Sequence, residues 1–413
     1  MHASVDSSPH APGPDPDRPL RLRRLVYLTE ADEVTIGSPE TDTYAVFPAD
    51  GAELVRQLAD GVTPREAAER YEAEHGESVD IADLIGVLAE LDLLRPADGQ
   101  DGAPEDGPAR PVRWQRLGRA VFSRPALTGY ALVTALAVAE TIRVPALLPR
   151  VDNLFFSPSY TLVVLVLFFG QAPLLALHEA FHALAGRRLG LRSRLSVGHR
   201  LVHLVLETSL DGLVSVPRRQ RYLPILAGML ADVLAIAVLT LAADVLRGVD
   251  AGVSRFCLAI AWATVLRLAW QGFFYLRTDL YVLLGTLLGC VDLHAAAGDV
   301  LRNAVRRFTG RPPVDLAVHH PADRRAARWY AWLMVVGYAF TLSMFAGVVL
   351  PTAYRLLRDV WLRLTGEASA AGRLDSLLLM LLTLAQTGAV VVLSVRERRA
   401  ARAAVRTAAA RSA

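Results

Sequence analysis

The sequence predicts a mainly α-helical protein: a polytopic membrane domain of about six transmembrane helices, preceded by a small soluble α+β domain of winged-helix-like type. Long uncharged apolar runs predict the membrane part, because each is long enough to cross a bilayer. The chain has 413 residues, of which 53% are hydrophobic and 21% charged, and the charges gather in the first 120 residues, the loops and the C-terminal segment. That distribution is typical of two modules joined in one chain.

The N-terminal module is predicted from short strands and helix-start residues. Residues 1–19 are rich in Pro, Ser, Asp and His and are expected to be disordered. A folded domain is expected over residues 20–95. Its strands are predicted at residues 25–28, 33–37 and 43–47. Three helices follow, with N-caps predicted at Asp50, Thr63 and Ser78. The third helix should bury one face that carries Ile81, Leu84, Ile85, Leu88 and Leu91.

The membrane module is expected over residues 113–400, after a Pro/Gly/Asp-rich linker at 96–112 and before a basic tail at 401–413. Six spans are predicted, at residues 126–148, 160–186, 222–246, 253–276, 327–350 and 374–395. Arginines concentrate before the first span and after the second, fourth and sixth. The positive-inside rule therefore predicts a multi-pass protein of the cell membrane with both termini in the cytoplasm. The N-terminal residues show no basic-then-apolar signal pattern, so insertion is expected to depend on the internal helices.

The second span ends in an HExxH motif formed by His178, Glu179 and His182. Residues four apart lie on one face of a helix, so the two imidazoles can bind one metal ion. Glu179 lies beside them and could hold a water, which is the arrangement of hydrolytic zinc sites. Ionisable groups at membrane depth are costly and indicate function. The motif therefore predicts a catalytic Zn²⁺ site, with an inactive remnant as the alternative.

Sequence spacing does not identify the third zinc ligand directly. Span four runs from outside to inside, which brings Asp279 to the same cytoplasmic depth as the histidines. Asp232 inside span three is the main competitor, and Asp211 lies in the loop before that span. A second four-apart set in the basic loop is interpreted as a solvated or interfacial face; it consists of His199, His203 and Glu207.

The membrane module resembles the site-2 protease family of intramembrane zinc metalloproteases, in its peptide zinc metalloprotease branch, over residues 113–307. The similarity rests on HEAFHALAGRRLG at 178–190 and on RRQRYLPILAGMLAD at 218–232, which is similar to the family's AGP helix without its proline. The family's third ligand is the aspartate of an NPxxxxDG pattern. Here QGFFYLRTD keeps Asp279 but replaces the asparagine, proline and glycine. The resemblance implies zinc held by His178, His182 and Asp279, with Glu179 as general base.

The N-terminal module resembles the PqqD-like precursor-peptide recognition domain, on its strand pair followed by DGAELVRQLADG, TPREAAERY and LIGVLAELDLL. Members of that family hold a leader peptide as an added strand, a known mode of peptide capture. The alternative is a generic α+β regulatory domain. Its acidic character argues against DNA binding.

Together these features predict an intramembrane zinc endopeptidase that cleaves a peptide, such as the leader of a ribosomally synthesised and modified peptide. Expected partners are that substrate or a membrane protein, the lipid bilayer, and peptide-modifying or export proteins. The net charge of +3 indicates no nucleic-acid partner, and two cysteines indicate no disulfide framework. The alternatives are a regulatory protease acting on a membrane-bound signalling protein, and a non-catalytic export or immunity protein with a vestigial site.

Overall fold

The computed structural model describes residues 16–30, 33–41, 43–95, 112–191, 194–200, 203–209, 211–366 and 369–411. The predicted disordered start and the predicted linker fall mostly outside these residues. The chain divides into two compact units. The smaller unit combines the N-terminal part, up to Gln115, with Leu189–Ser193 and Leu210–Arg221, and the larger unit contains the rest.

The smaller unit contains a three-stranded antiparallel sheet in the order β1-β2-β3. Its strands are β1 (Val26–Glu30), β2 (Glu33–Ser38) and β3 (Thr43–Pro48). Its helices are α1 (Ala49–Ala59), α2 (Pro64–His75) and α3 (Ile81–Glu90). Alternate residues of β2, Val34 and Ile36, are buried against Leu54 and Leu58 of α1 and Leu88 of α3. The sheet and α3 therefore share one core, as the periodicity of the third helix predicts.

Two of the three predicted helix caps differ in the structure. Thr63 caps α2 by accepting a hydrogen bond from the Glu66 amide, as predicted. Asp50 lies inside the first turn of α1, because β3 runs through Pro48 directly into the helix. Its carboxylate instead accepts a hydrogen bond from the Tyr71 hydroxyl at 2.7 Å. This hydrogen bond lowers the pKa of the Asp50 carboxyl.

The cap of α3 is Asp80 rather than Ser78. The chain stays extended over residues 78–80, which lets Val79 pack against the core. The Asp80 carboxylate then accepts hydrogen bonds from the amides of Ala82 and Asp83, each at 3.1 Å.

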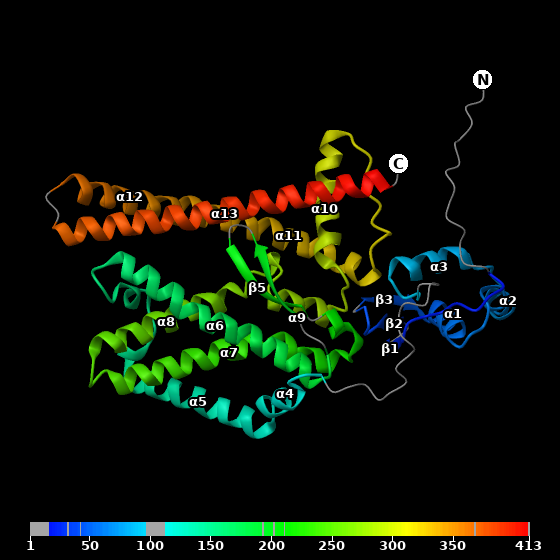
Figure 1. Cartoon of the computed structure of the whole chain (residues 1–413), viewed down its shortest axis with the longest axis horizontal. Coiled ribbons are helices and arrows are strands. Elements are labelled where there is room, and N and C mark those ends of the chain that lie inside the picture. The colour runs from blue at the N-terminus through cyan, green and yellow to red at the C-terminus, as the bar shows by residue number, and fades with distance from the viewer. Residues whose placement is uncertain are drawn as a thin grey trace. The chain divides into compact units, whose positions relative to one another are not determined.

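The described part of the chain is 74% helical. Among the described residues, five helices are long and apolar enough to cross a membrane, or six if one bent pair counts as a span. The five candidates are α5 (Arg124–Arg143), α6 (Tyr160–Arg188), α7 (Arg218–Leu246), α8 (Ala251–Trp270) and α11 (Pro321–Met344) with the turn that follows it. Figure 1 shows α5, α6, α7 and α8 lying along a common direction. Several long apolar helices thus fit a membrane protein, as predicted.

The fourth and sixth predicted spans differ in detail. The fourth helix, α8, ends at Trp270 rather than at residue 276. The chain then turns through Arg277, whose left-handed backbone (φ 56°) stops the preceding 3₁₀ turn (Phe274–Leu276). Helix α9 (Asp279–Leu288) begins two residues later and bends by 89° into α10 (Leu293–Thr309). The sixth predicted span lies inside α13 (Ala370–Arg411), which is not among the candidate spans found in the described residues, and some of its side chains fall outside the described ones.

The remaining elements connect these helices. They are α4 (Gln115–Val121), the hairpin of β4 (Arg194–Arg200) and β5 (His203–Ser209), the π turn Phe345–Val349, α12 (Leu350–Thr365), and the 3₁₀ turns Pro145–Leu147, Val151–Phe155 and Asp211–Ser215. Within α5, an ion pair joins Arg143 Nη2 to Glu140 Oε2 at 2.5 Å. The His199, His203 and Glu207 set lies on the hairpin, and its side chains are outside the described residues.

Candidate metal centre

Helix α6 places its two histidines on one buried face. His178 and His182 are 4% and 6% exposed, and their Nε2 atoms lie 3.2 Å apart. The helix can approach α7 closely here because Ala185 of α6 and Ala227 and Ala231 of α7 are small and buried in the same cluster. Close packing therefore brings the backbone of α7 next to the histidine pair.

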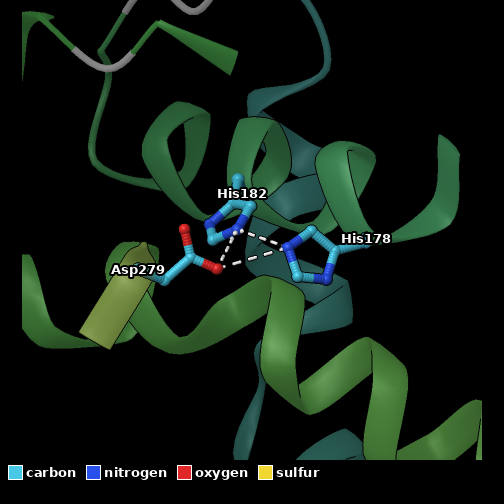
Figure 2. Close-up of side chains that lie close together, drawn as sticks. All are labelled: His178, His182 and Asp279. Carbon is cyan, nitrogen blue, oxygen red and sulfur yellow. Dashed lines mark hydrogen bonds and ion pairs between the residues drawn. The ribbon is translucent and has the colours of Figure 1, made fainter. Parts of the chain in front are cut away.

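The turn after α8 supplies a carboxylate to the same point. Asp279 is the first residue of α9, and its amide donates to Gln271 Oε1 at 3.0 Å. The Thr278 hydroxyl donates to the Gln271 carbonyl at 2.7 Å, which further fixes the turn. Asp279 Oδ2 lies 3.3 Å from Nε2 of both histidines. Figure 2 shows the three side chains pointing toward one another.

The spacing of these three atoms fits a small tetrahedral ion. Zinc bonds of about 2.0–2.1 Å at tetrahedral angles require ligand atoms about 3.3–3.4 Å apart. The three separations are 3.2, 3.3 and 3.3 Å. Asp279 Oδ2 is moreover buried, and among the described residues it makes no hydrogen bond of good geometry. Apart from the two imidazoles at 3.3 Å, no described group compensates this atom, and such an atom is costly to bury. Among those residues, His178, His182 and Asp279 form the one group able to hold a metal ion.

Gly228 of α7 keeps this space open. A Cβ atom at that position would lie 2.3 Å from His182 Nε2 and 2.4 Å from His178 Nε2. Both distances are far below van der Waals contact, so any side chain here would displace the imidazoles. The absence of a side chain at Gly228 is thus a condition for the three-ligand arrangement.

The other nitrogen of each imidazole also has a partner. His178 Nδ1 lies 3.0 Å from Asp232 Oδ2, and His182 Nδ1 lies 2.7 Å from the Pro224 carbonyl oxygen. Such contacts fix the tautomer and ring orientation of metal-binding histidines and leave Nε2 to face the ion. Asp232, the competing ligand candidate, therefore lies behind His178 and away from the point where the three atoms converge.

Asp232 is fully buried, and Arg267 of α8 compensates its charge. Arg267 Nη2 lies 2.5 Å from Asp232 Oδ1, and its Nε lies 3.3 Å from Oδ2. Gln171 of α6 accepts from Arg267 Nη1 at 3.0 Å and donates to the Ile260 carbonyl at 2.9 Å. Sequence reasoning missed Arg267 and Gln171. The sequence did contain a sign of this pair, because an arginine inside an apolar helix, such as Arg267 in α8, needs a buried partner.

Glu179 follows His178 on α6 and is also buried, at 8% exposure. The side chain of Asp211, the third carboxylate considered, is outside the described residues. The geometry thus brings His178, His182 and Asp279 together, while their role as zinc ligands stays a prediction.

No protein-family model, curated protein or solved structure matches this chain.

Proposed function

We propose that the protein is an intramembrane zinc metallopeptidase similar to the site-2 proteases. The observation that carries the proposal is the convergence of His178 Nε2, His182 Nε2 and Asp279 Oδ2 at tetrahedral spacing. Three protein ligands leave a fourth position for water or substrate, which distinguishes catalytic zinc sites from structural ones. The surrounding helices are apolar and long enough to span a bilayer.

The chemistry follows from the residues around the centre. A zinc ion bound here would act as a Lewis acid and lower the pKa of a bound water toward neutrality. Glu179, buried beside His178, would accept a proton from the attacking water and return it to the leaving amine of the cleaved peptide bond. Asp232 and the Pro224 carbonyl would hold the imidazoles in place. Glu179 is thus proposed as general base and not as a ligand.

The smaller unit is proposed to be a PqqD-like, winged-helix-like domain that captures the substrate. Its antiparallel sheet ends in two edge strands, β1 and β3, and an extended peptide can add to such an edge through main-chain hydrogen bonds. The substrate would then be a peptide such as the leader of a ribosomally synthesised, modified peptide. The arginine distribution supports a cytoplasmic position for both termini and for the His178 end of α6.

Metal content and hydrolysis, measured together, test the proposal. The full-length protein is purified in detergent as wild type, Glu179→Gln and Asp279→Ala, and assayed for bound zinc and for hydrolysis of unstructured casein. We expect Glu179→Gln to keep its zinc and lose at least about a hundredfold in rate, because it lacks only the base. Asp279→Ala should lose zinc and activity together.

Three results would contradict the proposal. Wild-type protein that binds no zinc after reconstitution would remove the metal centre. Wild-type hydrolysis by Glu179→Gln would show that the observed activity does not come from this site. Stoichiometric zinc without any Glu179-dependent hydrolysis would favour a vestigial site.

A further inference from the structure

A second feature of the larger unit is a hollow of about 470 Å³ between α10 and α11, whose lining includes none of the metal-centre residues. Its apolar lining comes from Ala296 and Val300 of α10, from Leu316 and Pro321, and from Ala327 of α11. Its polar lining consists of His319, Arg324, Arg325 and Arg328. Among the described residues, no carboxylate lines the hollow, although three guanidinium groups do.

The arginine charges are not neutralised by the surrounding described residues, since no carboxylate among them lies within ion-pair distance of Arg324, Arg325 or Arg328. Asp299 of α10 is the carboxylate that contacts this lining, and it is already engaged. Its Oδ2 lies 2.8 Å from His319 Nε2, and its Oδ1 accepts from Arg302.

Asp323, in the first turn of α11, is also engaged. It is 1% exposed and accepts the backbone amides of Val291 and Asp292 at 3.0–3.2 Å. The hollow therefore presents uncompensated positive charge, and guanidinium groups match phosphate oxygens in geometry.

The position of the arginines along α11 indicates the source of the anion. They lie in the first turns of a helix that begins at Pro321 and qualifies as a membrane span. Trp329 and Trp332 follow and are 45% and 72% exposed. Arginine followed by exposed tryptophan at the start of an apolar helix is typical of the membrane–water interface. With α11 spanning a bilayer, the hollow would lie at the level of lipid head groups.

Helix α10, which forms the other wall, has the character of a surface helix. It buries Leu293, Ala296 and Ala297 and exposes arginines on its other side, including Arg302 and Arg307. Figure 1 shows α10 running across the direction of α11. An amphipathic basic helix of this kind lies along an anionic membrane surface.

We propose that this hollow binds the head group of an anionic phospholipid, with Arg324, Arg325 and Arg328 contacting the phosphate and the apolar wall contacting the glycerol and the first acyl carbons. Basic pockets between membrane helices are known sites of this kind. The proposal is independent of the peptidase activity.

The test compares two charge-matched variants of the full-length protein in detergent. Arg324→Gln/Arg328→Gln removes two charges from the hollow, and Arg307→Gln/Arg311→Gln removes two exposed arginines that do not line it. Each protein is titrated with phosphatidylglycerol in mixed micelles, with phosphatidylcholine and with inorganic phosphate, and binding is followed by the rise in Tm. We expect Arg324→Gln/Arg328→Gln to bind phosphatidylglycerol about thirtyfold more weakly than wild type, which corresponds to about 1 kcal/mol per arginine. The control variant, Arg307→Gln/Arg311→Gln, should bind it as wild type does.

An equal loss of phosphatidylglycerol affinity in both double variants would overturn the proposal, because it would indicate binding to non-specific surface charge. Wild-type protein without preference for phosphatidylglycerol over phosphatidylcholine would also overturn it. Binding of inorganic phosphate as tight as that of the lipid would identify a free-phosphate site instead. Labelling of the wild type by photoreactive phosphatidylglycerol gives a result that needs no variant. Label on α10 or the start of α11 supports the site, and label confined to other helices contradicts it.

Discussion

Gly228→Ala is the smallest substitution that separates metal binding from folding. The new Cβ atom would lie 2.3–2.4 Å from both imidazole Nε2 atoms, whereas ordinary contact begins at 3.4 Å. The rings or helix α7 must therefore move by about 1 Å, which is several times the deviation of about 0.2 Å that a zinc bond tolerates. At least one histidine should be lost as a ligand.

The effect on metal affinity should exceed the effect on stability. Loss of an outer-shell contact already costs about ten- to a hundredfold in affinity, so displacement of a ligand should weaken zinc binding at least about a hundredfold, or about 2.7 kcal/mol. The free energy of unfolding should fall by no more than about 1–3 kcal/mol. Alanine in place of a helical glycine contributes up to about 1 kcal/mol, and the overpacking costs about 1–3 kcal/mol.

The assay is a zinc competition titration against a chelator, with Gly129→Ala as the matched control. Gly129 is also a helical glycine, in α5, and nothing lies within 4 Å of its would-be Cβ. Gly129→Ala should bind zinc as wild type does. If Gly228→Ala keeps zinc affinity within about threefold of that control, the argument that this glycine opens the metal site is wrong.

Two further predictions concern the smaller unit and the topology. Deletion of residues 1–95 should raise the apparent KM for a tethered peptide substrate far more than it lowers kcat, because the domain supplies effective concentration; equal changes would make it a structural element. Reporter fusions at Leu94 and Ala413 should both report a cytoplasmic position, and an external signal at either would refute the depth argument for Asp279.

Much of the layout was predictable because it depends on local pattern. Apolar runs identified α5 to α8 and α11, and the HExxH spacing identified the histidine pair. The end of α8 was not predictable, since residues 271–276 are as apolar as a helix interior. The chain leaves the helix there because Gln271 uses its side chain and carbonyl to hold Asp279 and Thr278. Long-range contacts of this kind leave no periodic signal.

The role of Asp232 illustrates the same limit within the site. A single carboxylate in an apolar helix predicts a buried partner, but that partner could be either a metal ion or a buried arginine such as Arg267. Depth along the helices favoured Asp279 as the ligand. Only the packing of α6, α7 and α8 shows that Asp232 faces the Nδ1 side of His178 and pairs with Arg267 from behind.

The pair of Asp232 and Arg267 allows stability and metal binding to be separated. Arg267→Leu alone should cost about 3–5 kcal/mol of unfolding free energy, because the fully buried Asp232 carboxylate loses its cationic partner and keeps only the imidazole of His178. The double change Asp232→Leu/Arg267→Leu should recover most of that loss, since apolar replacement of a buried ion pair is often neutral. Zinc affinity should nevertheless stay about ten- to a hundredfold below wild type, because His178 Nδ1 has lost the partner that orients its ring. Thermal unfolding and zinc titration of the three proteins would measure this. A double variant that regains wild-type affinity would show that Asp232 only neutralises Arg267, and one that binds no zinc at all would make Asp232 a direct ligand.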